Sequence, residues 1–345
     1  MTDRPGLRLG RIAGLVRGAV ERCRLDLRGC TVLTEAASGP YVVTPVLAAL
    51  AGARVVAVTR STRYGAVDDV RAATMELARQ CGVADHIAIT TESSRELVVD
   101  ADIVTNSGHV RPLDAATIAR MKPGTVIALM YEGWEFRPAD LDLEACCRAR
   151  VLVAGSMERH PHFDVFSYLG PLAVKLLVDA GVGAYHSSVL LLCDNPFLDY
   201  LRRGLEAGGA CVEVARKPAD ARGTAFDAIV VSLTPRPQPA LDADDAQTIA
   251  SRWPEAVVGQ FFGDIDREAL AASNIAVWPP EPPAPGHMGV LPSELGAEPT
   301  VRLQASGLKS AEVLWRRGMT GTLGRDQEYV EVLVDRDGIL CDAYC

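Results

Sequence analysis

Residues 53–90, ARVVAVTRSTRYGAVDDVRAATMELARQCGVADHIAIT, decide the fold. The stretch opens with a short apolar run, Arg54–Thr59, continues through an amphipathic segment, Val67–Cys81, and ends in a second apolar run, His86–Thr90. Short apolar runs that alternate with amphipathic helices are typical of a parallel sheet with crossover helices. The stretch therefore predicts a strand, a helix and a strand of an α/β domain.

The same alternation continues on both sides and predicts two Rossmann-like, doubly wound units in tandem, with an interdomain cleft. The strands expected in the first unit are Thr31–Thr34, Arg54–Thr59, His86–Thr90, Asp102–Asn106, Thr125–Tyr131 and Val151–Gly155. The helices expected between them are Tyr41–Ala51, Val67–Cys81, Asp114–Met121 and Ala139–Arg148. The strands expected in the second, shorter unit are Ser187–Cys193, Ala210–Ala215, Asp227–Leu233, Ala256–Phe262 and Asn274–Pro279.

These elements set the expected domain boundaries. Residues 1–165 form a Rossmann-like cofactor domain with an N-terminal helix, and residues 166–186 a connecting helix. Residues 187–290 form the shorter unit, and residues 291–345 a returning helix and a C-terminal hairpin. The first loop of the shorter unit, Asp194-Asn195-Pro196, lacks glycine and suits a nucleotide poorly, so we expect the shorter unit to bind the substrate.

Composition excludes several classes of protein. The net charge of −9 argues against a nucleic-acid partner. The sequence contains no run of 18 apolar residues, so it predicts no membrane span. The nine cysteines contain no CxxC pair and have no histidine at ligand spacing, which predicts no metal site and a reducing, cytoplasmic compartment. A small-molecule substrate is expected, and a homodimer stays open.

The first expected loop of the sheet is a candidate phosphate site, because ligands of open α/β sheets bind beyond the carboxyl ends of the strands. Ser38 and Gly39 precede a helix there, so backbone N–H groups could face a phosphate. The loop is not a GxGxxG fingerprint, and a tight structural turn explains these residues equally well.

The end of the second expected strand carries positive charge. Dinucleotide-binding folds usually place an acid there to hold ribose hydroxyls, whereas this chain has Thr59, Arg60, Ser61 and Arg63. Two guanidiniums and two hydroxyls can clamp a 2′-phosphate, which favours NADP over NAD and counts against S-adenosylmethionine. The alternative is a solvated basic loop.

The loops after the fourth and fifth strands supply further candidates. Asn106 and Ser107 are expected beside a nicotinamide ribose, and His109 could carry a proton or be an idle loop histidine. Glu132 and Tyr131 are candidates for acid–base catalysis or substrate positioning.

The densest titratable cluster follows the sixth strand. His160 and His162 lie between Glu158 and Asp164, and histidine titrates in the range that proton transfer to a carbonyl needs. A structural or substrate-binding role, or the start of a metal site, would explain the cluster as well. Because no third ligand is evident, we assign no metal ligand.

The stretch ADIVTNSGHVRPLDAATIARMKPGTVIALMYEG, Ala101–Gly133, resembles the cofactor domain of D-2-hydroxyacid dehydrogenases and S-adenosylhomocysteine hydrolases. The match rests on a strand, a polar loop, a helix ending in Met-Lys-Pro-Gly and an apolar strand, and it covers about a tenth of the chain. The resemblance implies an NAD(P)-binding Rossmann domain and a two-lobed hinge.

The expected function is therefore an NAD(P)-dependent oxidoreductase that acts on a small polar or anionic substrate in the cleft. The first alternative is an S-adenosylmethionine-dependent methyltransferase, because Glu76–Thr90 is similar to the middle of a class I methyltransferase. The sequence also leaves open a two-lobed glycosyltransferase and a catalytically degenerate binding protein.

Overall fold

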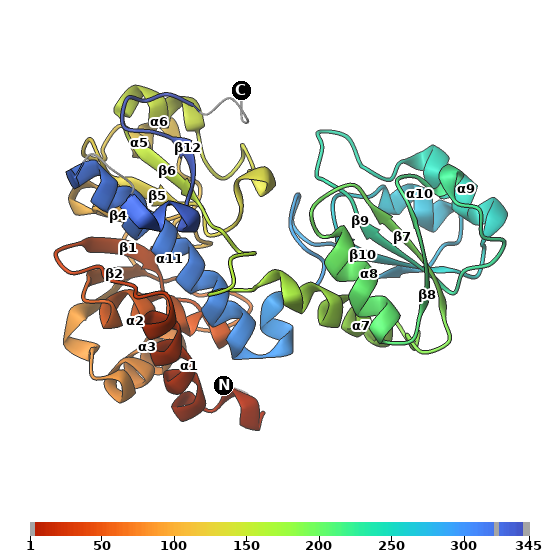
Figure 1. Ribbon diagram of the computed structural model, residues 1–345, viewed down its shortest axis with the longest axis horizontal. Coiled ribbons are helices and arrows are strands. Elements are labelled where there is room, and N and C mark those ends of the chain that lie inside the picture. The colour runs from red at the N-terminus through yellow and green to blue at the C-terminus, as the bar shows by residue number, and fades with distance from the viewer. Residues whose placement is uncertain (1–3, 321–323, 341–345) are drawn as a thin grey trace. The chain divides into compact units, whose positions relative to one another are not determined.

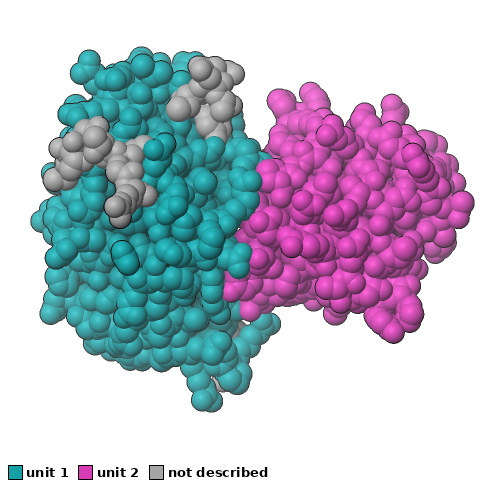
Figure 2. Space-filling model, in the orientation of Figure 1, with its two compact units in different colours: residues 1–165, 296–345 teal, residues 166–295 magenta. Residues whose placement is uncertain are grey.

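The computed structural model describes residues 4–320 and 324–340 and consists of two compact units (Figure 2). Unit 1 comprises residues 1–165 and 296–345, and unit 2 comprises residues 166–295. Each unit has its own parallel sheet with helices on its faces, so the predicted α/β class with two doubly wound units is confirmed. The interdomain cleft stays a prediction.

Unit 1 is built on a seven-stranded sheet in the order β12-β6-β5-β4-β1-β2-β3 (Figure 1). Its strands are β1 (Thr31–Glu35), β2 (Arg54–Val58), β3 (Ile87–Thr90), β4 (Ile103–Thr105), β5 (Val126–Ala128), β6 (Leu152–Gly155) and β12 (Glu331–Val334). Strands β1 to β6 are parallel, and β12 runs antiparallel to β6 at the edge. The six parallel strands have the order 3-2-1-4-5-6, which is the dinucleotide-binding arrangement.

Helices cover both faces of this sheet, and each face buries its own apolar cluster. One face carries α1 (Leu9–Arg22), α2 (Val43–Leu50), α3 (Val67–Cys81) and α11 (Ala297–Thr320). The other carries the short helices α4 (Ser94–Leu97), α5 (Ala115–Ile118) and α6 (Leu143–Ala149). Because the parallel strands are buried on both sides, they have continuous apolar sequences such as the buried Val126-Ile127-Ala128.

The chain returns to unit 1 through α11, which is the returning helix expected within residues 291–345. This helix approaches β5 closely at Gly307, where an added Cβ would lie 2.5 Å from Met130 Sδ. The expected C-terminal hairpin begins with β12 and turns at Asp335–Gly338, with a bridge between Val334 and Leu340. The rest of its second arm lies outside the described residues.

Unit 2 has a five-stranded, wholly parallel sheet in the order β11-β10-β9-β7-β8. Its strands are β7 (Ser188–Cys193), β8 (Cys211–Ala215), β9 (Ala228–Ser232), β10 (Val257–Phe262) and β11 (Val277–Trp278). Its helices are α7 (Leu169–Asp179), α8 (Leu198–Ala207), α9 (Ala243–Arg252) and α10 (Arg267–Ala272). If β3 is removed from the parallel order of unit 1, the remaining strands have the same order as the strands of unit 2.

No helix in the described part of the chain combines the length and the apolar character that crossing a bilayer requires.

Candidate functional site

Three loops of unit 1 meet where the strand order reverses, at the carboxyl ends of β1, β2 and β4. An added Cβ on Gly65, after β2, would lie 3.5 Å from Ser38 Cβ, in the loop after β1. His109 N, after β4, donates to Glu35 Oε2 over 3.0 Å. In open α/β sheets this reversal point is where ligands bind, so it is the centre of the candidate site.

The loop after β1 forms the turn into a helix that its sequence predicts. Gly39 adopts a φ of +62°, a left-handed conformation that glycine accepts at no steric cost. A 3-10 turn, η2 (Gly39–Val42), leads from it into α2. The Ser38 side chain does not cap this turn, and a Cβ added to Gly39 would have no neighbouring heavy atom within 4 Å. Ser38 and Gly39 therefore leave room for a ligand at the start of the helix.

The basic turn after β2 is a tight loop closed by two hydrogen bonds between Thr62 and Gly65, of 3.0 and 3.2 Å. Arg63 donates to Tyr64 Oη over 2.6 Å and lies 4.8 Å from the centre of its ring. Tyr64 is 68% exposed, so the pair forms a solvent-facing platform. Arg60 donates instead to Gly108 O over 3.3 Å, across the reversal point. The two guanidiniums of the predicted clamp thus have different partners.

Two further hydroxyl groups belong to this turn, one exposed and one buried. Ser61 Oγ accepts from Val67 N, the first residue of α3, over 3.4 Å. Thr59 is fully buried, and its hydroxyl has no hydrogen-bond partner among the described residues. An unpartnered buried hydroxyl costs free energy, and buried groups of this kind concentrate where a ligand or water completes the site.

Glu35 is a residue that sequence reasoning did not single out. Its carboxylate ends β1 and accepts from His109 N, at the position where dinucleotide-binding folds hold a phosphate. Beside it, burial lowers the pKa of His109, the Glu35 charge opposes that shift and the Arg60 charge adds to it. His109 Nδ1 is buried without a partner in the described part of the chain. The only signal in the sequence was a charge at the end of an apolar strand.

Asn106, Ser107 and Tyr131 come together at the ends of β4 and β5. Asn106 is fully buried and donates from Nδ2 to Tyr131 Oη over 2.9 Å. Ser107 Oγ lies 2.9 Å from Thr105 Oγ1. Arg111, which the sequence did not single out either, donates from Nε to Asn106 O over 2.9 Å. These contacts form a buried polar cluster next to the reversal point.

Glu132 fastens the loop after β5 to the loop after β6. It is 1% exposed and accepts from Trp134 Nε1 at 3.0 Å and from Glu158 N at 3.1 Å. Arg159 pairs with the same carboxylate through NH2 at 3.1 Å. Burial raises the pKa of the neighbouring Glu158 well above its usual range, and the charges of Glu135 and Glu132 add to that effect. The catalytic role of Glu132 stays a prediction.

His160 and His162 lie apart from these clusters, against η9 (Gly324–Tyr329). His162 Nδ1 is 2.7 Å from Tyr329 Oη, and His162 N donates to His160 Nδ1 over 3.1 Å. His160 Nε2 lies 3.8 Å from a carboxylate oxygen of Glu328. Burial lowers the pKa of His160, and the charge of His162 adds to that shift. Both histidines therefore contact the C-terminal segment, and their catalytic role stays a prediction.

Within the residues that the structure describes, no three His, Cys, Asp or Glu side chains group in a way that could hold a metal ion.

The corresponding loop of unit 2 is filled by its own side chains. Asp194 accepts from Thr234 N over 2.7 Å and pairs with Arg236 over 2.6 Å. Asn195 Nδ2 donates to Ser232 O over 2.9 Å. These contacts engage the polar side chains of the loop after β7 with residues that follow β9.

The two doubly wound sheets define a two-domain Rossmann protein, and the similar solved structures include dehydrogenases of the D-2-hydroxyacid type. The A chain of dipicolinate synthase from Bacillus subtilis has a TM-score of 0.53 at 11% identity, with 87% of this chain and 100% of that chain covered. The NAD-dependent formate dehydrogenase from Staphylococcus aureus, in complex with NAD, has a TM-score of 0.47 at 10% identity, with 90% and 100% covered.

NAD⁺-bound 3-phosphoglycerate dehydrogenase from Entamoeba histolytica has a TM-score of 0.45 at 11% identity, with 86% of this chain and 97% of that chain covered. No protein-family model and no curated protein matches the sequence. At these identities the likeness is one of fold, and the dipicolinate synthase A chain, with its TM-score of 0.53, supports the two-domain Rossmann fold that the resemblance implies.

Proposed function

We propose that unit 1 binds a nicotinamide dinucleotide and that the protein is an NAD(P)-dependent oxidoreductase acting on a small polar or anionic substrate. One observation carries the proposal: loops bearing Gly39, Arg60 and His109 converge at the reversal point of a sheet with the dinucleotide-binding strand order. The free, mostly buried cysteines of the described chain fit a reducing cytoplasm. A homodimer stays a proposal.

The residues present fit such a cofactor at several points. The open turn at Ser38 and Gly39 offers backbone donors to a phosphate. The buried Thr59 hydroxyl and His109 Nδ1 lack partners that a ligand could supply. Arg60 and Arg63 supply the charge that a 2′-phosphate needs, so we propose NADP ahead of NAD.

Ligand-dependent thermal stability tests the proposal. NADPH, NADH, S-adenosylmethionine and a nucleotide sugar are added separately to the full-length protein. A ligand at 100 times its dissociation constant stabilises the fold by about 2.7 kcal/mol, so we expect a rise in melting temperature with NADPH and a smaller one with NADH. Stabilisation by S-adenosylmethionine alone would overturn the assignment in favour of a methyltransferase.

Glu35 favours the methyltransferase as the second candidate. A carboxylate beside a pyrophosphate repels it, whereas the same carboxylate can accept hydrogen bonds from the hydroxyls of a ribose. Arg60 lies on the same loop cluster and offsets part of the repulsion. The sign of the effect of Glu35 on binding therefore separates the two candidates.

For Glu35→Gln we expect NADPH to bind about 5- to 10-fold more tightly, because the substitution removes a like charge without changing the side-chain shape. Isothermal titration calorimetry measures the affinities, and Glu92→Gln, at an exposed glutamate after β3, is the control for net charge. If S-adenosylmethionine binds and E35Q weakens it by tenfold or more, the carboxylate holds a ribose and the methyltransferase hypothesis stands instead.

A further inference from the structure

The polar cluster at the ends of β4 and β5 has a fixed direction of hydrogen bonding. A guanidinium can only donate, so the side-chain atom of Asn106 that meets Arg111 Nε at 3.2 Å must be its carbonyl oxygen, Oδ1. The amide nitrogen of Asn106 consequently faces Tyr131 Oη, to which it donates over 2.9 Å. Arg111 thereby sets the orientation of the amide, and the amide sets the role of the phenol.

In this series of hydrogen bonds, the hydroxyl hydrogen of Tyr131 is not used. Its oxygen accepts from Asn106, and among the described residues no acceptor lies within reach of its own hydrogen. Tyr131 is 6% exposed, and the guanidinium carbons of Arg137 and Arg111 lie 4.2 and 5.8 Å from the centre of its ring. Asp140 pairs with both arginines, at 2.8 and 3.4 Å. The hydroxyl is therefore held in place, and its hydrogen is available for a hydrogen bond to a ligand.

The place of Tyr131 in the sheet indicates which part of a ligand it meets. A doubly wound sheet consists of two mononucleotide-binding halves, and a dinucleotide lies across the point where they join. The turn with Arg60 and Arg63 belongs to the half formed by β1, β2 and β3, whereas Tyr131 follows β5 in the other half. The adenosine end belongs with the basic turn, so the nicotinamide end belongs with Tyr131.

We propose that the Tyr131 hydroxyl is a hydrogen-bond donor to the nicotinamide group of the dinucleotide, and that Arg111 is a positioning residue that acts on it through Asn106. The inference rests on the proposed function and adds a binding contact to it. Burial raises the pKa of Tyr131 to about 12, and the charges of Arg137 and Arg111 oppose that rise, so the phenol keeps its hydrogen at neutral pH. The hydroxyl acts as a donor and not as a base.

Two ligands that differ only in the nicotinamide group test this assignment. Calorimetry measures the affinity of the full-length protein for NADPH and for 2′-phospho-ADP-ribose, which lacks the nicotinamide ring. For Tyr131→Phe we expect NADPH to bind about tenfold more weakly, as for the loss of one buried hydrogen bond, and 2′-phospho-ADP-ribose to bind as in the wild type. Tyr64→Phe, in the adenosine half, is the matched control and should not distinguish the two ligands.

Arg111 variants separate positioning from packing. In Arg111→Met the amide of Asn106 is free to turn its oxygen toward Tyr131. The phenolic hydrogen then bonds to that oxygen and not to the ligand, so NADPH affinity should fall as in Y131F. Arg111→Lys keeps a donor-only partner and should restore most of the affinity for NADPH. A purely structural role of Tyr131 or Arg111 would weaken both ligands equally, and that result overturns the inference.

The failures of the two proposals are distinguishable. If the wild type binds neither NADPH nor NADH, the proposed function fails and the contact falls with it. If the wild type binds NADPH and Y131F retains its full affinity for NADPH, the cofactor assignment stands and Tyr131 is not the donor.

Discussion

Replacing Arg60 and Arg63 together by alanine is expected to lower the affinity for NADPH about 100-fold and the affinity for NADH less than about threefold. Hydrogen bonds from a guanidinium to a phosphate contribute about 1.5–3 kcal/mol each, and a 100-fold change corresponds to about 2.7 kcal/mol. NADH lacks the 2′-phosphate, so it loses only the long-range attraction of two positive charges.

The two arginines should contribute unequally, because their present contacts differ. Arg63 lies on the exposed Tyr64 ring and gives up a solvent-facing contact when it turns to a phosphate. Arg60 already donates to Gly108 O beside Glu35. Removing Arg60 therefore also removes a positive charge that offsets the negative charge of the Glu35 carboxylate. We therefore expect Arg60→Ala to weaken both cofactors somewhat and Arg63→Ala to weaken NADPH selectively.

Calorimetry with both cofactors at two salt concentrations measures these effects. Arg71→Ala is the matched control, because Arg71 is an exposed arginine on α3 whose nearest acid, Asp68, lies 3.8 Å away. Equal weakening of NADPH and NADH in the double variant would remove the case for a 2′-phosphate and leave NAD as the cofactor.

The strands were predictable because their signal is local. A parallel strand buried on both faces needs a continuous apolar run, and the buried runs at Val126-Ile127-Ala128 and Leu190-Leu191-Leu192 mark β5 and β7 directly. The pairing of β12 with β6 has no such signal. Its partner lies more than 170 residues earlier in the chain, so the sequence predicted a terminal hairpin and not an edge strand of unit 1.

The candidate site was predictable only where strand ends define it. Asn106 and Arg60 follow apolar runs directly, so the order of the strands brings their loops together. Density of titratable residues along the chain was a weaker guide. His160 and His162 are adjacent in sequence to Glu158, but their partner is Tyr329 of the returning C-terminal segment, which no local pattern reveals. Arg111 was missed for the same reason, since its role depends on Asn106 and Asp140 around it.

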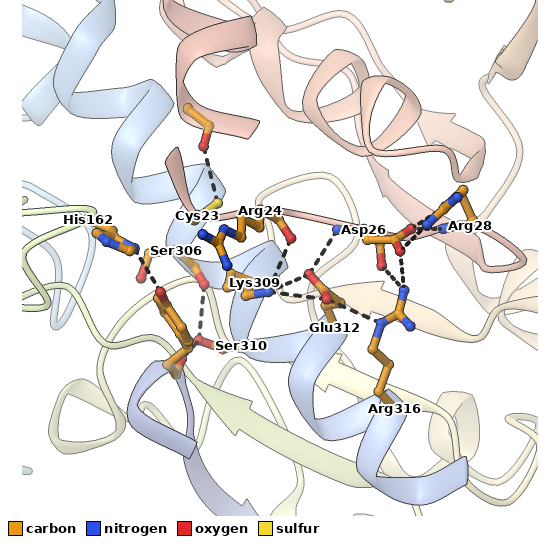
Figure 3. A network of polar contacts seen from close by, with 12 residues as sticks. Cys23, Arg24, Asp26, Arg28, His162, Ser306, Lys309, Ser310, Glu312 and Arg316 are labelled. Atoms are coloured by element: carbon orange, nitrogen blue, oxygen red, sulfur yellow. Dashed lines mark hydrogen bonds and ion pairs between the residues drawn. The ribbon is translucent and has the colours of Figure 1, made fainter. Parts of the chain in front are cut away.

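The buried ion pair on α11 should be a main support of unit 1. Lys309 and Glu312 are each 3% exposed, and Lys309 Nζ lies 3.0 and 3.2 Å from the two carboxylate oxygens (Figure 3). Lys309 also donates to Arg24 O at 3.3 Å, and Glu312 accepts from Asp26 N at 3.0 Å. The pair thus joins α11 to the segment between α1 and β1.

For Lys309→Met we expect the free energy of unfolding to fall by about 3 kcal/mol at pH 8, because Glu312 is left as a buried charge. Arg316, 3.2 Å from Glu312, is 40% exposed and replaces only part of the lost attraction. Burial already raises the pKa of Glu312 and Lys309 opposes that rise, so losing the lysine raises it further. A raised carboxyl pKa favours the neutral form in the folded state, and stability is then lost as the pH rises through that pKa.

The defect of K309M should therefore be smaller at pH 5 than at pH 8, since protonated Glu312 no longer needs a counter-charge. Urea denaturation at the two pH values measures it. The double variant Lys309→Met with Glu312→Leu should be more stable at pH 8 than K309M alone, because an apolar pair fills the site without an unpaired charge. Lys175→Met, which removes a more exposed lysine paired with Glu294 at 3.2 Å, should cost less than about 1 kcal/mol. A K309M defect no larger than that of K175M, or one that is the same at both pH values, would contradict a buried ionised pair at this position.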